Sequence, residues 1–185
     1  MNLKRIKSLL IIVIIWFQKM FDICYRLILG TPRLKRSQIT AQLFLGGQYS
    51  LVGLQKLKDM GITAIVNMRE TSLYTAPIEG FKYLHLPTVD NTPPAIKDLN
   101  RGAIFVDEEI KNNGKVYIHC RQGLGRGPSM AIAYLLKLGT TYEDAFALVK
   151  SVRSFIKPRP EQIIRLKELE QYYKKEELLR SKIKI

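Results

Sequence analysis

Cysteine is scarce in this chain of 185 residues, which contains only two. Cys24 lies in an N-terminal apolar segment and Cys120 in a glycine-rich loop, so a disulfide framework is not expected. A reducing compartment suits such a chain, because free thiols persist there. The sequence has no internal repeat, and its length predicts one domain with a sizeable core and an appendage.

Acidic residues are few in comparison with basic ones. Sixteen Asp and Glu stand against thirty Lys and Arg, which gives a formal net charge of +14 and a pI near 9.8. This excess predicts a polyanionic partner, such as nucleic acid, anionic lipid headgroups or a phosphorylated substrate. Nucleic acid is not expected, because the sequence has no recognised nucleic-acid-binding module and no aromatic stacking platform.

The apolar run from Leu9 to Phe17 contains no charge, and the segment that follows carries scattered charges. The run covers ~14 Å as a helix, which is short of the ~30 Å hydrocarbon core of a bilayer. On a continued helix Lys19, Asp22 and Arg26 fall on one face. We therefore expect residues 8–29 to associate with a membrane surface. A membrane span and a helix packed on the domain remain alternatives.

Sidedness follows from the basic residues that flank this helix. More of them follow the apolar run than precede it, so the main domain is expected on the cytoplasmic side. No convincing signal-peptide cleavage site is visible. The expected organisation is a membrane-associating helix over 1–30, a basic linker over 31–37, the main domain over 38–175 and a charged tail over 176–185.

Apolar strand patterns alternate with helical patterns along the main domain. Strands are expected at 43–45, 62–68, 83–86 and 116–118, and helices at 51–60, 99–111, 130–138, 142–155 and 161–179. Thr140 and Glu143 have the spacing of a capping box for the fourth of these helices. The alternation predicts an α/β fold with a central, mostly parallel sheet flanked by helices.

The stretch VYIHCRQGLGRGPS, from Val116 to Ser129, reads as a strand, a tight loop and the start of a helix. A loop at this junction turns its backbone N–H groups inward beside the positive end of the helix dipole, which makes a site for a dianion. Such a site favours the thiolate form of Cys120, and Arg126 can offer a planar fork to two phosphate oxygens. Behind the thiol, His119 is expected to orient the loop. The combination predicts a nucleophile aimed at phosphorus.

His119, Cys120, Gly123 and Arg126 match the pattern HCxxGxxR. In this the chain resembles the cysteine-dependent protein tyrosine and dual-specificity phosphatases. The resemblance implies that Cys120 forms a phosphocysteine intermediate and that Arg126 binds phosphate and stabilises the transition state. The phosphate-binding residues that it implies are Arg121, Gln122, Gly123, Leu124, Gly125 and Arg126.

One position departs from the family pattern. The family usually has Ser or Thr directly after the arginine, where the hydroxyl helps the thiolate to leave, whereas this chain has Gly127. Two residues further on lies Ser129. Either hydrolysis of the intermediate is slower in this chain, or Ser129 supplies the hydroxyl; the sequence leaves both open.

Protonation of the departing oxygen needs an acid, which typically contributes 10²–10⁴-fold in rate. Asp90 is the candidate, because it lies on a loop bracketed by Pro87 and Pro94, and the family places its general acid on a mobile loop at a similar remove from the cysteine. The alternative is that Asp90 only turns the loop. Asp98 is the second candidate, although capping of the following helix suits it better.

Several other polar residues receive weaker interpretations. Arg121 either adds positive charge at the pocket or is a surface arginine, and His85 is expected in the core. A basic cluster is expected to face an anionic substrate or the membrane, or else to be a solvated surface; it comprises Lys150, Arg153, Lys157 and Arg159.

Other loops that carry a reactive thiol fit less well. Sulfur-transferase loops are typically one residue shorter than this one. Low-molecular-weight tyrosine phosphatases and arsenate reductases place the cysteine near the start of the domain, unlike this chain. A nucleotide-binding loop needs Lys before Ser or Thr after its glycines, and this loop has no such pair. Residues 86–169 resemble the phosphatidylglycerophosphate phosphatase branch of the dual-specificity group, on Thr88–Asp90 and Arg159–Pro160.

The expected function is a dual-specificity protein phosphatase that hydrolyses phosphomonoesters on Tyr and Ser/Thr. The alternatives are a phospholipid phosphatase and a non-catalytic phosphate-binding protein. No metal and no cofactor are expected, because backbone amides and Arg126 neutralise the phosphate charge. The expected partners are a phosphorylated protein or an anionic phospholipid as substrate and a membrane surface, with the chain as a monomer.

Overall fold

The computed structural model describes residues 3–73 and 78–183. Residues 1–2, 74–77 and 184–185 lie outside these ranges; they belong to the expected N-terminal helix, to the stretch between the expected strands at 62–68 and 83–86, and to the expected charged tail. A four-stranded sheet runs in the order β1-β4-β2-β3, and each neighbouring pair is parallel. Its strands are β1 (Leu43–Gly46), β2 (Ala64–Asn67), β3 (Lys82–His85) and β4 (Val116–His119). The α/β fold expected from the sequence is confirmed.

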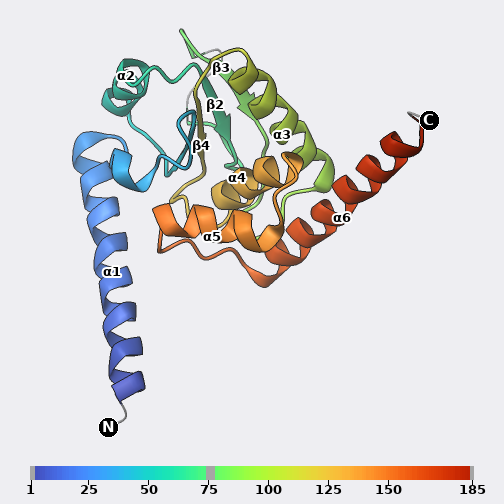
Figure 1. Ribbon diagram of the computed structural model, residues 1–185. Coiled ribbons are helices and arrows are strands. Elements are labelled where there is room, and N and C mark those ends of the chain that lie inside the picture. The colour runs from blue at the N-terminus through green and yellow to red at the C-terminus, as the bar shows by residue number, and fades with distance from the viewer. Residues whose placement is uncertain (1–2, 74–77, 184–185) are drawn as a thin grey trace.

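Helices cover both faces of the sheet (Figure 1). Alternate strand residues bury their side chains on opposite faces. Leu45, Val66 and Ile118 belong to the larger core cluster, whereas Phe44, Ile65 and Tyr117 belong to the smaller one. The larger cluster packs under α3 (Ile96–Lys111), α4 (Arg126–Lys137), α5 (Tyr142–Val152) and α6 (Pro160–Ile183), and the smaller one under α2 (Leu51–Asp59).

The most deeply buried helix of the domain is α4, which starts directly after the glycine-rich loop. All its residues from Arg126 to Leu136 are buried. Pro128 stands in the first turn, where a missing backbone N–H costs no helical hydrogen bond. Full burial of each large apolar side chain contributes about 1.5–3 kcal/mol, so the helix that follows the loop is firmly held.

Some element ends differ from the expected ones. Thr141, rather than Thr140, caps α5, because its Oγ1 accepts from the Asp144 amide at 3.2 Å while the Thr140 amide still bonds to Leu135 in the turn that closes α4. The helix ends at Val152 rather than at residue 155, and the backbone of Arg153 leaves the helical region. The last helix, α6, continues past its expected end into the expected tail.

The N-terminal segment forms a single helix, α1 (Leu3–Leu29), whose first half stands away from the domain in Figure 1. Within the described residues it is the one helix that is long and apolar enough to cross a membrane, judged by length and composition. After it comes a short 3-10 helix, Leu34–Arg36. Thr31 and Ser37 are buried and Gln38 pairs with Phe44 in an antiparallel bridge, so the expected linker is packed against the domain.

Candidate active site

The glycine-rich loop connects β4, which ends at His119, to α4, which begins at Arg126. It therefore lies at the carboxyl ends of the parallel strands, where open α/β sheets bind ligands. Gly123 has φ of +68°, and a Cβ there would lie 2.5 Å from the carbonyl oxygen of Gly46, so no other residue fits. The curled loop brings the Gly123 amide to 3.2 Å from Cys120 Sγ, to which it donates. The thiol thus accepts a hydrogen bond from a backbone N–H group of the loop.

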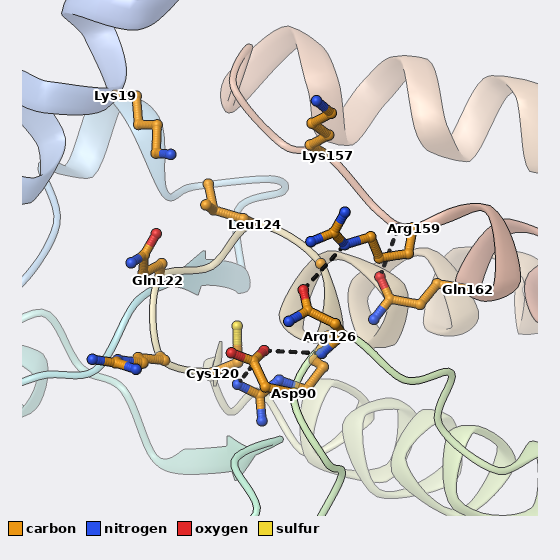
Figure 2. Close-up of a pocket in the computed structure, with 12 residues that line it drawn as sticks. Lys19, Asp90, Cys120, Gln122, Leu124, Arg126, Lys157, Arg159 and Gln162 are labelled. Atoms are coloured by element: carbon orange, nitrogen blue, oxygen red, sulfur yellow. Dashed lines mark hydrogen bonds and ion pairs between the residues drawn. The ribbon is translucent and has the colours of Figure 1, made fainter.

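Arg126 closes the loop and is 5% exposed. Its Nη1 donates to the Thr88 carbonyl oxygen at 2.7 Å, and its Nη2 lies 2.8 Å from Asp90 Oδ1. Asp90 itself is more than half exposed and reaches over the loop toward Cys120 (Figure 2). The proline-bracketed segment is thereby brought to the thiol, as its spacing suggested.

A pocket of about 290 Å³ opens above Cys120. Four cationic side chains line it in addition to Arg126, and they come from three separate parts of the chain (Figure 2). The full lining is Lys19, Asp90, Asn91, Cys120, Arg121, Gln122, Leu124, Gly125, Arg126, Lys157, Arg159 and Gln162. The arrangement can hold a dianion next to a sulfur nucleophile and a carboxyl group.

His119 lies behind the loop and is 1% exposed. Its Nδ1 lies 3.3 Å from the Cys120 carbonyl oxygen, and because a carbonyl only accepts, this nitrogen carries the proton. The ring stacks on Tyr117 and meets Tyr49 edge-on. Burial lowers the pKa of His119 to about 3, so the imidazole is neutral at physiological pH. It can hold the loop but cannot serve as a titrating base.

Gly127, where the chain departs from the family pattern, and Ser129 both lie close to the glycine-rich loop. Ser129 is fully buried, and its Oγ donates to the Gly125 carbonyl oxygen at 3.0 Å, which engages the hydroxyl within α4. A Cβ at Gly127 would lie 3.6 Å from Cys120 Sγ and 3.0 Å from Leu45 Cδ1. The position of Gly127, not that of Ser129, is the one next to the sulfur.

The expected basic cluster is divided by the fold. Lys157 and Arg159 line the pocket, and Lys150 is exposed on α5. Arg153 was expected on a surface and this was wrong, because its side chain is 0% exposed. Its guanidinium contacts carbonyl oxygens of the glycine-rich loop. A basic residue among other basic residues gives no sequence signal for such burial.

Two further polar residues brace the segment that carries Asp90. Arg159 Nε donates to Asn91 Oδ1 at 3.1 Å, and Gln162 Nε2 donates to the Thr92 carbonyl oxygen at 2.9 Å. Sequence reasoning had noted Arg159 only as part of the basic cluster and the branch resemblance, and it had missed Gln162 and the pocket position of Lys19.

His85 and Asp98 lie outside the pocket lining. His85 is half-buried on β3 with its Nε2 2.8 Å from the Arg69 carbonyl oxygen, which is a structural contact. Asp98 lies in the first turn of α3, but the N-cap residue is Ala95 and makes no side-chain capping bond. The expected capping role of Asp98 is therefore wrong, although a carboxylate in the first turn suits the helix dipole.

Known proteins resemble this chain in sequence and in fold. Residues 43–172 match the family "Dual specificity phosphatase, catalytic domain". Dual specificity protein phosphatase 1-A of Xenopus laevis is 30% identical over 135 residues, which are 70% of this chain and 36% of that protein. The human dual specificity protein phosphatase 1 is 32% identical over 124 residues, covering 65% and 33%. The chain thus spans about a third of the length of these relatives.

Solved structures cover the domain more completely. The crystal structure of PTPMT1 superposes with a TM-score of 0.71 at 26% identity, over 77% of this chain and 98% of that one. A human protein described as tyrosine phosphatase-like serine/threonine/tyrosine-interacting protein superposes at 0.67 with 31% identity, over 74% and 96%. The matched region holds the sheet, the loop with Cys120 and Arg126, and the segment with Asp90. On these grounds the chain belongs to the dual-specificity group of the cysteine-dependent phosphatase family.

Proposed function

We propose that this protein hydrolyses phosphate monoesters through a phosphocysteine intermediate on Cys120. The observation that carries the proposal is the convergence of the Cys120 thiol, the Arg126 guanidinium and the Asp90 carboxyl on one pocket. Each group matches one requirement of the reaction: a nucleophile, a clamp for the phosphoryl oxygens and a proton donor. Inward-facing amides of the loop neutralise further negative charge.

In the first step the substrate dianion replaces Asp90 as the partner of Arg126. Cys120 Sγ attacks phosphorus, so an S–P bond forms while the P–O bond to the leaving group breaks. The carboxyl of Asp90 gives its proton to the departing oxygen, which leaves as an alcohol. Arg126 holds two equatorial oxygens, and the bonds that it makes strengthen as charge develops on them.

In the second step water hydrolyses the phosphocysteine. The Asp90 carboxylate takes one proton from the water, whose oxygen attacks phosphorus while the S–P bond breaks. Inorganic phosphate and the Cys120 thiolate are released, and Asp90 is protonated again. The thiolate leaves without help from a neighbouring hydroxyl, because position 127 is glycine and the Ser129 hydroxyl is bonded to the Gly125 carbonyl oxygen. We therefore expect this step to be the slower one.

Turnover of p-nitrophenyl phosphate tests the reaction. Cys120→Ser should lower kcat at least ~10³-fold, because an alcohol is a far weaker nucleophile than a thiolate at neutral pH. A matched control is Cys24→Ser, which alters the exposed cysteine of α1. Equal activity of Cys120→Ser and the native enzyme would exclude the mechanism. Binding of phosphate without any turnover by the native chain would instead leave the non-catalytic phosphate-binding alternative.

The proposed substrates are proteins phosphorylated on Tyr or on Ser/Thr. A phospholipid monoester is the second candidate, for three reasons: the pocket carries four cations beyond Arg126, it lies beside the apolar helix α1, and one solved PTPMT1 structure is described as a complex with PI(5)P. A side-by-side assay on phosphotyrosine peptide, phosphoserine/threonine peptide and phosphatidylglycerophosphate in detergent micelles separates the two. A kcat/KM that is highest for the lipid by tenfold or more would replace the protein substrate with the lipid.

We also propose that residues 8–29 associate with a membrane and that a monomeric catalytic domain, residues 38–175, lies on its cytoplasmic side. The support is that α1 exposes an almost continuous apolar surface, including Leu10 at 60% exposure. Flotation with phosphatidylcholine–phosphatidylglycerol vesicles tests it. Leu10→Glu should reduce bound protein at least ~10-fold, because a charge in the bilayer costs about 3 kcal/mol. Leu178→Glu, on α6 and equally exposed at 61%, is the control and should float like the native chain.

A further inference from the structure

The polar side chains in the second half of α1 point toward the catalytic domain rather than toward water. Gln18, Asp22 and Arg26 recur at four-residue spacing and so share one face of the helix. Asp22 is 1% exposed. Gln18 Oε1 accepts hydrogen bonds from Arg36 and from Ser154. The helix therefore docks by its polar face and leaves its apolar faces exposed, which is the reverse of an ordinary surface helix.

Asp22 pairs with Arg153 in the interior. Arg153 Nη2 lies 3.1 Å from Asp22 Oδ2, and Nη1 lies 3.4 Å from Oδ1, so the contact is bidentate. Neither side chain is accessible beyond 2%. Loss of one partner of such a pair leaves an uncompensated charge in the interior. Arg153 is therefore held by the Asp22 carboxylate of α1, together with the Arg36 carbonyl oxygen, to which its Nη1 donates at 2.9 Å.

The Arg153 guanidinium also donates hydrogen bonds to the glycine-rich loop. Its Nη2 donates to the Gln122 carbonyl oxygen at 3.3 Å, and its Nε approaches the Gly123 carbonyl oxygen at 3.4 Å. These carbonyls belong to the peptide units that fix which way the Gly123 and Leu124 amides point. A shift of Arg153 would therefore turn amides that bind the phosphoryl oxygens.

A second contact joins the helix to the other side of the loop. Arg26 Nη1 donates to the Gln48 carbonyl oxygen at 2.9 Å, and the Gln48 amide donates to the Arg121 carbonyl oxygen at 3.1 Å. Arg121 directly follows the nucleophile. The helix thus braces the residues on both sides of Gln122.

Lys19 lies on the same part of α1 and lines the pocket itself. In Figure 2 its side chain descends from the helix toward the mouth of the pocket, across from Lys157 and apart from Arg126. Lys19 therefore lines a part of the pocket other than the one that Arg126 occupies. It suits an anionic group on the leaving-group part of the substrate.

We propose that α1 contributes to the active site: Asp22 positions the phosphate-binding loop through Arg153, and Lys19 binds a second anionic group of the substrate. The inference rests on the proposed phosphatase reaction and deepens it. It assigns the preferred substrates to phosphate monoesters whose leaving group carries another negative charge. Asp22 and Arg153 are positioning residues, whereas Lys19 contacts substrate.

Asp22→Asn in the full-length protein tests the positioning role. The variant keeps the size of the side chain but removes the counter-ion, so we expect kcat for phenyl phosphate to fall at least ~10-fold through misplaced amides. Glu143→Gln is the matched control, because Glu143 is an exposed carboxylate of α5 that pairs with Lys167 of α6 and does not line the pocket. Its kcat should equal that of the native enzyme.

The double variant Asp22→Asn, Arg153→Gln separates positioning from mere stability. Removing both charges together restores the balance of charge in the interior, so the unfolding temperature should recover relative to Asp22→Asn alone. The kcat should stay low, because glutamine cannot bond to the two loop carbonyls as the guanidinium does. A double variant with native kcat, or Asp22→Asn with native kcat, overturns the positioning role.

Two aryl phosphates that differ by one charge test Lys19. Lys19→Met should raise KM for 4-carboxyphenyl phosphate about 5-fold more than KM for phenyl phosphate, as expected for loss of one partly exposed ion pair. Lys35→Met removes the same charge from an exposed lysine after the helix and should not change the ratio. An unchanged ratio in Lys19→Met overturns the binding role.

The failure of this inference differs from the failure of the proposed function. If Cys120→Ser is inactive while Lys19→Met and Asp22→Asn behave like the native enzyme, the phosphatase reaction stands and α1 is only an anchor. If the native chain itself turns over neither aryl phosphate, the proposed function fails and the inference fails with it.

Discussion

The helices α1 and α4 are both rich in apolar residues and are buried in opposite ways. In α4 the apolar residues Ile132 and Leu135 lie inside the domain, and the helix starts at Arg126, the proposed phosphate clamp. In α1 the apolar residues Ile12 and Phe17 are more than half exposed, whereas Asp22 is buried. One helix places the loop from inside the core, and the other touches the loop from outside through a buried ion pair. A large exposed apolar surface marks an interaction site, which fits the membrane association proposed for α1.

Asp90 departs most from this contrast between buried groups at the loop and an exposed apolar helix. Its side chain is more than half exposed and still belongs to the proposed reaction. Asp90→Asn should lower kcat for phenyl phosphate 10²–10⁴-fold, because the phenolate leaving group needs the proton. The loss should be smaller with p-nitrophenyl phosphate, whose leaving group is stable without it. Steady-state kinetics on both esters checks this, and equal kcat of variant and native enzyme on both would remove Asp90 from the mechanism.

The same substitution in the two helices sharpens the comparison. Ile132 is 0% exposed and Ile12 is 61% exposed. Ile132→Ala should lower the free energy of unfolding by about 2–5 kcal/mol, since it opens a cavity in the core. Ile12→Ala should change it by less than about 0.5 kcal/mol. Denaturant unfolding in detergent micelles measures both, and similar losses would mean that the first half of α1 packs on the domain in solution.

The burial of His119 behind the loop predicts that the free energy of unfolding depends on pH. The pKa of His119 is lowered to about 3 in the folded protein, below its unfolded value of about 6.5. Its contribution to stability is therefore complete above pH 6.5 and is lost as the pH falls toward 3, because only the unfolded chain takes up the proton. At pH 5 the loss should be about 2 kcal/mol relative to pH 7.

Unfolding free energies of the native chain and of His119→Asn at pH 7 and pH 5 isolate the contribution of His119 to this pH dependence. The difference between the two proteins should shrink by about 2 kcal/mol at the lower pH. Parallel losses in both proteins would show that His119 is accessible to protons in the folded state. Such a result would weaken its assignment as a neutral support of the loop.

The smallest expected effect concerns position 127, at the junction of loop and α4. Gly127→Ser places a hydroxyl next to Cys120 Sγ, where a Cβ lies 3.6 Å from the sulfur. A hydrogen bond to the leaving thiolate is worth about 1 kcal/mol, so hydrolysis of the intermediate should become about 5-fold faster. Stopped-flow assays should then show a burst of p-nitrophenolate in the native enzyme that is smaller in the variant. A native enzyme without a burst contradicts slow hydrolysis.

The sequence predicted the features that depend on neighbouring residues. Four apolar runs identified the strands, and the glycines between Cys120 and Arg126 identified the loop, because tight curvature needs residues without a Cβ. The position of Asp90 over the loop also followed from its proline-bracketed segment. In each case the physical cause lies within a short stretch of chain.

Features that depend on distant parts of the chain were not predicted. Asp22 and Arg153 are far apart in sequence, and neither shows by its identity that the other neutralises it. Arg153 was therefore interpreted as part of an exposed basic cluster, and packing of the N-terminal helix on the domain was only an alternative to its association with a membrane surface. The cap of α5 was misplaced by one residue, because Thr140 and Thr141 are chemically equivalent until the backbone bond of Thr140 to Leu135 is known.

The central claim is that the sulfur of Cys120 carries the phosphoryl group during turnover. The most direct measurement is mass spectrometry of the peptide that contains Cys120, after the full-length enzyme has been quenched while it hydrolyses p-nitrophenyl phosphate. The account predicts one added phosphoryl group on Cys120, and none in Cys120→Ser. Steady turnover with an unmodified Cys120 peptide at every quench time would contradict it.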